Sequence, residues 1–176
     1  MISIALYKPQ IPPNTGNIAR LCVALDCDLH IVGKTPIKWN QADLRRAGLD
    51  HWDKLSFEHF SSFKNYFSKY KLRRIISVTK ASPVRYWDFT FLEDDILLFG
   101  NETRGLPPKL INFLNYSVSI PMWGEGVRSL NLANAVSVVA YEAYRQIAAR
   151  QKILLSGGKD GLNFKRTYYM QKKKRH

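Results

Sequence analysis

The chain has 176 residues, a mass of 20.3 kDa and 45% hydrophobic residues, which suits one globular domain with a substantial core. No apolar run approaches the ~20 residues of a membrane span, and the first residues lack the basic stretch of a signal peptide, so we expect a cytoplasmic protein without a membrane partner. The net charge of +13 favours a polyanionic partner such as a nucleic acid, with a surface charged only for solubility as the alternative.

The basic excess is spread along the chain. The residues after Arg150 carry a net charge of +7 and the preceding residues +6, so the charge is not confined to a tail. Ser156–Gly158 is typical of a flexible break. We therefore predict a folded domain over residues 1–155 and a basic, flexible tail over residues 156–176.

Hydrophobic periodicity predicts alternating strands and helices along the folded part. In chain order these are strand Ile2–Tyr7, helix Asn17–Leu25, strand Leu29–Val32, helices Gln41–Ala47 and Phe60–Tyr70, strands Arg74–Val78 and Ile96–Phe99, helix Lys109–Leu114, strand Val118–Ile120 and helix Leu132–Arg150. This alternation predicts an α/β fold, with a mostly parallel sheet covered by helices on both faces.

Several side chains have an ordinary structural interpretation. Cys22 and Cys27 are too few and too closely placed for a disulfide framework or a zinc site, so we expect buried thiols and no metal. No histidine has a partner at motif spacing, and we assign none a catalytic role. Asp94 and Asp95 are expected to form a turn, whereas Tyr141 and Tyr144 share a second face of the last helix that suits either a subunit interface or solvent.

Two segments place a glycine- or serine-rich turn between an apolar strand and a helix. They are Phe99–Pro107, with the sequence FGNETRGLP, and Ile120–Ala135, which ends in RSLNLANA. Backbone groups left open at such junctions bind small molecules in α/β proteins. Their spacing excludes the G-x-G-x-x-G and P-loop motifs, so the sequence predicts one composite pocket of a different kind.

A third segment, Pro12–Arg20, has the sequence PPNTGNIAR. Asn14 and Asn17 bring amide groups to the start of a predicted helix, and Arg20 follows within about one turn of Asn17. A helix N-terminus beside an arginine favours a phosphate, although Asn and Thr also cap helices that bind nothing.

Together, these three segments resemble the three motifs of the SpoU-type RNA ribose 2′-O-methyltransferases of the SPOUT superfamily, over nearly all of residues 1–150. The string Leu44–Trp52, LRRAGLDHW, resembles the signature of the TrmL branch, the tRNA (cytidine/uridine-34-2′-O)-methyltransferases. The resemblance implies methylation of the wobble nucleotide of tRNA, on leucine isoacceptors, with S-adenosylmethionine as cofactor. Another tRNA nucleotide, rRNA, or a non-catalytic RNA-binding role is the alternative.

The resemblance also implies a deep trefoil knot at the C-terminal end of the domain and a homodimer. Carried over by position, the cofactor contacts are Val78, Thr79, Gly100, Glu102, Ile120, Ser129 and Leu130. The segment Trp123–Val127 departs from the family, because it is glycine-rich where relatives vary in sequence and length.

The same resemblance assigns roles to the remaining site residues. Arg20 is the family's candidate for deprotonation, but a guanidinium is a poor base, so we expect an electrostatic clamp on phosphate and alkoxide. Asn14 would orient the hydroxyl, and Asn17 would face the substrate. Glu102 is expected to accept backbone amides, and Asn131 to cap the last helix. Arg45 and Arg46 would meet tRNA phosphates or remain solvated.

Overall fold

The computed structural model describes residues 2–37, 54–126 and 129–150. Its elements, in chain order, are β1 (Ser3–Tyr7), α1 (Pro12–Leu25), β2 (Asp28–Val32), β3 (Phe57–Phe60), α3 (Phe63–Tyr70), β4 (Ile75–Val78), the 3-10 helix η2 (Tyr86–Asp88), β5 (Ile96–Phe99), α4 (Pro108–Phe113), β6 (Tyr116–Val118) and α5 (Leu132–Arg150). Within these residues, no helix has the length and apolar character required to cross a membrane.

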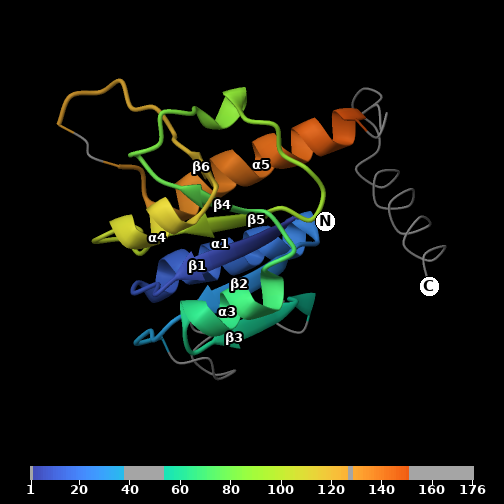
Figure 1. Ribbon diagram of the computed structural model, residues 1–176, viewed down its shortest axis with the longest axis vertical. Helices are drawn as coiled ribbons and strands as arrows, with labels where there is room; N and C mark the ends of the chain where they lie inside the picture. Colours follow the sequence, from blue (N-terminus) through green and yellow to red (C-terminus); the bar gives the residue numbers. More distant parts are fainter. Residues whose placement is uncertain (1, 38–53, 127–128, 151–176) are drawn as a thin grey trace.

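The strands form one parallel six-stranded sheet in the order β3-β2-β1-β5-β4-β6 (Figure 1). Alternation along β1 divides the core in two: Ile4 and Leu6 join the cluster beneath α1 and α5, whereas Ala5 joins the cluster beneath α3 and α4. Helices therefore cover both faces of a parallel sheet, which confirms the predicted fold class.

The order of the strands places a topological switch point between β1 and β5. The chain leaves β1 through α1, on one face, toward β2, and leaves β5 through α4, on the other face, toward β6 at the opposite edge. Connections that depart in opposite directions open a crevice at the carboxyl ends of the two strands, where α/β proteins bind ligands.

Several predicted boundaries were wrong. Helix α1 begins at Pro12 rather than Asn17, because both prolines occupy its first positions, where a missing N–H costs nothing. Residues 57–60 form an edge strand that the sequence analysis missed, so the next helix begins at Phe63 instead of Phe60. The last strand covers 116–118 instead of 118–120. The predicted helix Gln41–Ala47 lies outside the described residues.

Other expectations for single side chains have mixed outcomes. Cys22 and Cys27 are free and buried, as predicted. Tyr141 is exposed, but Tyr144 donates a hydrogen bond of 2.6 Å to the carbonyl of Leu25, so this tyrosine belongs to the packing of α5 on α1 rather than to an open face. Among the residues that the structure describes, no group of three His, Cys, Asp or Glu side chains could hold a metal ion.

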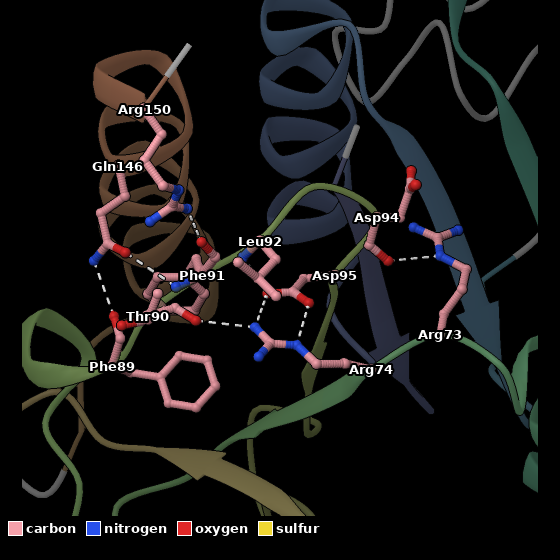
Figure 2. Close-up of polar contacts among 10 residues, drawn as sticks. All are labelled: Arg73, Arg74, Phe89, Thr90, Phe91, Leu92, Asp94, Asp95, Gln146 and Arg150. Carbon is pink, nitrogen blue, oxygen red and sulfur yellow. Dashed lines mark hydrogen bonds and ion pairs between the residues drawn. The ribbon is translucent and has the colours of Figure 1, made fainter. Parts of the chain in front are cut away.

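The connection between β4 and β5 is fastened to the last helix (Figure 2). The amide of Gln146 donates to the carbonyl of Phe89 and accepts from the N–H of Phe91, both at 3.0 Å. Arg150 donates to the carbonyl of Phe91, whose own ring is fully buried. These contacts join two segments that lie more than fifty residues apart along the chain.

Asp95 ends this connection, and its role was only partly predicted. Asp94 adopts a left-handed conformation as part of the expected turn, but Asp95 is buried. The Asp95 carboxylate accepts two hydrogen bonds from Arg74, at 2.7 and 2.6 Å, and a third from the N–H of Leu92 at 2.7 Å (Figure 2). This bidentate ion pair therefore holds the start of β5 against the start of β4.

Asp95→Asn should lower the free energy of unfolding by about 2–4 kcal/mol, because it removes one charge of a partly buried pair and leaves Arg74 incompletely compensated. Asp88→Asn, at an exposed pair with Arg85, is the matched control and should cost less than about 1 kcal/mol. Equilibrium urea unfolding measures both. Equal losses in the two variants would show that Asp95 is not a special anchor.

His30 lies in β2, within an aromatic cluster on the α3 face. The Tyr66 hydroxyl lies 3.0 Å from Nδ1 and the Tyr70 hydroxyl lies 3.4 Å from Nε2, and the Tyr70 hydroxyl donates to Glu58 at 2.8 Å. Burial raises the pKa of Tyr66, so its hydroxyl stays protonated and can donate to Nδ1. Burial likewise lowers the pKa of His30 from 6.5 to about 4, so the imidazole is neutral in the folded protein.

Stability should therefore fall as the pH decreases from about 6.5 toward 4, because the unfolded chain takes up a proton on His30 that the folded chain refuses. His30→Gln should flatten this pH dependence, whereas Leu72→Ala, which changes a non-titrating and almost fully exposed side chain, should leave it intact. Urea midpoints measured across this range provide the comparison. An unchanged slope in His30→Gln would contradict the assignment.

Candidate active site at the switch point

Three segments meet through side-chain amides and one carboxylate at the carboxyl ends of β1 and β5. The amide nitrogen of Asn14, in the first turn of α1, donates to Glu102 Oε1 at 3.1 Å. The oxygen of the same amide accepts from Asn131 at 2.9 Å. Asn14 is buried, whereas Glu102 is half-buried and Asn131 is exposed, so both contacts are partly shielded from water. We call these three residues, Asn14, Glu102 and Asn131, the polar junction.

Glu102 also supplies what the start of α1 lacks. The residue before the helix is Ile11, whose apolar side chain cannot cap the helix by accepting a hydrogen bond, and the first turn contains no acidic residue. The two carboxylate oxygens of Glu102 accept from the backbone N–H groups of Gln10 and Ile11, each at 3.0 Å. The expectation that Glu102 binds backbone amides is thus confirmed, and its charge lies where the helix dipole favours an anion.

The turn that carries Glu102 closes tightly on itself. A β-carbon at Gly100 would lie 2.1 Å from the backbone carbon of Gly105, so only glycine fits there. The side chain of Asn101 accepts from the N–H groups of Thr103 and Arg104, at 3.2 and 2.7 Å. This turn fixes the position of Glu102 relative to the end of β5.

Asn131 caps the last helix, as expected, and also contacts Asn14. Its side-chain oxygen accepts from the N–H of Ala133 at 2.8 Å and so caps α5. Its amide nitrogen reaches Asn14. The start of the last helix is therefore tied to the start of the first.

The remaining predicted cofactor residues lie at the same edge of the sheet. Val78, the last residue of β4, is in register with Phe99 of β5 and Val118 of β6. The residues that follow these three strand ends, Thr79, Gly100 and Ser119, are therefore brought to one level, with Thr79 held by a backbone hydrogen bond of 2.9 Å to Val118. Ile120 is the next residue after Ser119. Ser129 and Leu130 are exposed immediately before α5.

The predicted substrate residues occupy a different position. Asn17 and Arg20 are three residues apart on the exposed face of α1, whereas Asn14 on the same helix turns into the polar junction. The structure thus separates the two groups: Asn14 and Glu102 are in contact, and Arg20 lies about 9 Å further along the helix axis. Arg45 and Arg46 lie outside the described residues.

Sequence reasoning missed two members of this region. Gln10 uses its backbone N–H on Glu102, and its side chain accepts from the hydroxyl of Thr103 at 2.8 Å. These residues are 93 positions apart, and neither stands at a motif spacing. The tight turn after Gly100 was the one available signal that this segment packs closely against another.

A parallel α/β sheet with a composite, partly backbone-lined site at its switch point defines a cofactor-binding α/β enzyme. Residues 1–141 match the model of the SpoU rRNA Methylase family, and the chain belongs to this family.

Curated relatives cover most of the chain. The tRNA (cytidine(34)-2′-O)-methyltransferase of Yersinia pestis is 40% identical over 154 residues, which is 84% of this chain and 94% of that protein. The protein of the same name from Escherichia coli strain K12 is 39% identical over 149 residues, again 84% of this chain and 94% of the relative.

Solved structures agree with the fold. A structure described as giving insight into 2-OH methylation of C/U34 on tRNA superposes with a TM-score of 0.78 at 39% identity, covering 83% of this chain and 95% of the other. The SpoU methyltransferase AviRb of Streptomyces viridochromogenes, in complex with AdoMet, has a TM-score of 0.71 at 28% identity and covers 82% and 57%.

The residues present fit adenosylmethionine. Val78 and Ile120 are half-buried, and Met122 and Leu130 are exposed, so these segments contain apolar side chains of the kind that a flat adenine ring requires. The adjoining strand ends offer backbone groups for its polar edge. Glu102, the acidic residue of the polar junction, has both oxygens engaged by the start of α1 and acts as part of the frame.

The polar junction can be tested with isosteric exchanges. Glu102→Gln should destabilise the protein by about 1–3 kcal/mol, because the amide nitrogen cannot accept from a backbone N–H. Asn14→Asp should cost at least as much, since it sets a second carboxylate about 3 Å from the first.

The double variant, which carries both exchanges, should recover part of the loss, because the new amide at position 102 can donate to the new carboxylate at position 14. Urea unfolding of the four proteins gives the coupling, and Glu125→Gln, at an exposed position, serves as the control. Strict additivity of the two single losses would contradict a direct interaction.

Proposed function

We propose that the protein methylates the ribose 2′-OH of the wobble nucleotide, position 34, of tRNA, and that leucine isoacceptors are its substrates. The observation that carries this proposal is the polar junction at the switch point. It occurs in a chain about 40% identical, over 84% of its length, to a relative named for that reaction. Adenosylmethionine, when bound, supplies an activated methyl group, so the protein must mainly align the hydroxyl and favour its ionised form.

Each site residue has a role consistent with its position. Arg20, on the exposed face of α1, holds a phosphate next to the target ribose and stabilises negative charge at O2′. Asn17, one turn earlier on that face, contacts the same nucleotide. Asn14 and Glu102 set the angle at which α1 leaves the sheet, and hence the place of Arg20. Asn14 therefore acts by orientation.

The cofactor site lies at the carboxyl ends of β4, β5 and β6. Register between the three strands supports this placement, because it brings the residues after each strand to one level. The proposed contacts are Val78, Thr79, Gly100, Ile120, Ser129 and Leu130, with Glu102 as their frame. Arg45 and Arg46 are proposed to bind tRNA phosphates.

We also propose that the domain spans residues 1–155 and is knotted, with α5 passing inside the connection between β4 and β5. The bonds from Gln146 to that connection support this path (Figure 2). A homodimer is supported by exposed apolar side chains on and beside α1 and α5, namely Ile11, Leu130 and Tyr141. A tRNA substrate implies a cytoplasmic enzyme, to which the basic residues 156–176 would add affinity for RNA.

The second candidate is methylation of another nucleotide, including one in rRNA. It is favoured by the description of the family itself, which names rRNA. A non-catalytic RNA-binding protein of this fold is the candidate from another class. The intact polar junction argues against it, since three side chains from distant segments meet there around the buried amide of Asn14, an arrangement with little purpose if the site has no use.

The direct test is to incubate the protein with bulk tRNA, with rRNA and with methyl-labelled adenosylmethionine, and then to map the label. We expect label at the ribose of position 34 of tRNA. Label at another ribose would support the second candidate, and no label in any RNA would remove the enzymatic proposal.

Arg20→Ala should reduce methyl transfer by about 100- to 1000-fold, the usual cost of one lost electrostatic donor, while cofactor affinity changes little. Arg20→Lys keeps the positive charge but loses the paired N–H donors of the guanidinium. Its rate of methyl transfer should therefore lie between those of the wild type and Arg20→Ala. Leu72→Ala is the control, because Leu72 is almost fully exposed and precedes the amino end of β4, whereas the site lies at the carboxyl ends of the strands. Equal loss of cofactor binding in Arg20→Ala would contradict the role given to Arg20.

A further inference from the structure

Two tryptophans from separate segments stack on the surface beside the proposed cofactor site. Trp87 lies in η2, and Trp123 lies in the segment that leads to α5. Their ring centroids are 6.0 Å apart and their planes differ by 8°. Trp123 is nevertheless 83% exposed, so Trp87 covers only a small part of its surface. Because Trp87 is also exposed, the two rings form one apolar surface of the kind that marks a contact with a partner.

Of the two tryptophans, Trp87 has its position fixed by backbone hydrogen bonds of neighbouring residues. The N–H of Tyr86 donates to the carbonyl of Ser119 at 2.9 Å, and the N–H of Ser119 donates to the carbonyl of Val84 at 2.8 Å. Tyr86 also packs edge-on against Trp87. The guanidinium of Arg85 lies 5.6 Å from the Trp87 ring centroid. Trp87 is thus anchored to the end of β6.

Trp123, by contrast, stands on an open segment. A β-carbon at Gly124 or Gly126 would meet no atom of the described residues within 4 Å, and Gly126 has a φ of 84°. The backbone after the tryptophan is therefore uncrowded, and most of the ring surface that Trp87 does not cover is open. A ring supported at one edge and accessible over the rest can accept a second flat group by stacking.

The position of the pair favours a nucleobase as that group. Trp123 follows Ile120, a proposed cofactor contact, by three residues, so their Cα atoms are at most about 11 Å apart. A base near the reacting ribose lies within this range. The protein carries a net charge of +13, and an arginine beside stacked aromatic rings is typical of surfaces that bind single-stranded nucleic acid.

We propose that Trp123, supported by Trp87 and Arg85, stacks on an unpaired base of the RNA close to the methylated nucleotide. This inference rests on the proposed function and adds a positioning contact to it. Because every base has a π-face, stacking here sets affinity and the register of the strand more than sequence preference. We call Arg85, Trp87 and Trp123 the platform. The platform therefore holds the unpaired part of the RNA while Arg20 acts on the ribose.

The test uses the full chain and a synthetic anticodon stem–loop RNA. Trp123→Ala should raise the Kd for this RNA, and the KM in methyl transfer, by about 5- to 100-fold, the usual effect of losing one stacked base. Trp123→Phe should keep most of the affinity, and kcat at saturating RNA should stay close to that of the wild type. Leu72→Ala is the control, because that side chain is also highly exposed but precedes the amino end of β4, away from the carboxyl ends of the strands.

Three results would overturn the proposal. One is an unchanged RNA Kd in Trp123→Ala, and another is a matching loss of adenosylmethionine affinity, which would assign the ring to the cofactor site. The third is a shift in oligomeric state by size-exclusion chromatography, which would assign it to a contact between copies.

Tryptophan fluorescence separates this proposal from the enzymatic one. RNA should quench the wild-type signal, and the quenching should shrink in Trp123→Phe. Quenching without methyl transfer would leave the platform standing and refute the proposed function. Methyl transfer with the same RNA affinity and KM in the wild type and in Trp123→Ala would support the proposed function and refute the platform.

Discussion

The contact on which the site depends is the carboxylate of Glu102 against the start of α1. That helix opens with Ile11 and two prolines, so it has neither a capping side chain nor an early acidic residue of its own. Glu102 supplies the missing acceptor and the missing negative charge from 91 residues away. The direction of α1, and with it the exposed face that carries Arg20, is consequently set by the turn that follows β5.

Parallel register imposes the second constraint. Since Val78 is paired with both Phe99 and Val118, the three strands end together and their connections begin at one edge of the sheet. The connections leave β1 and β5 in opposite directions, the arrangement at which α/β proteins bind ligands. The polar junction joins α1 to the turn after Gly100 at this place, and the exposed face of α1 stays available for a substrate.

The buried strands and α5 were predictable because each carries a strong local signal: continuous apolar runs in β4 and β5, and a long apolar stripe from Leu132. The sequence failed where the signal was tertiary. The strand 57–60 has a glutamate and a histidine at its centre and is stabilised by pairing with β2, so its own pattern suggested nothing. The predicted helix begins only at Asn17, although the first turn of a helix accepts Pro12 and Pro13. In the site, the motifs identified Asn14 and Glu102 separately, but their contact depends on a fold that brings distant segments together.

Rigidity and openness are divided between the two sides of the proposed site. Asn14 has both polar ends of its side chain engaged, and Glu102 has both oxygens engaged, so neither can adjust without breaking a hydrogen bond. Trp123 stands on a glycine-flanked segment with space around it. A methyl transfer needs the first property, because alignment supplies most of the rate. Capture of a single-stranded loop needs the second, because the loop must be admitted before it is aligned. Trp123 and Asn131, the residue that caps α5 and completes the polar junction, lie only eight residues apart in the sequence, so one short part of the chain serves both properties.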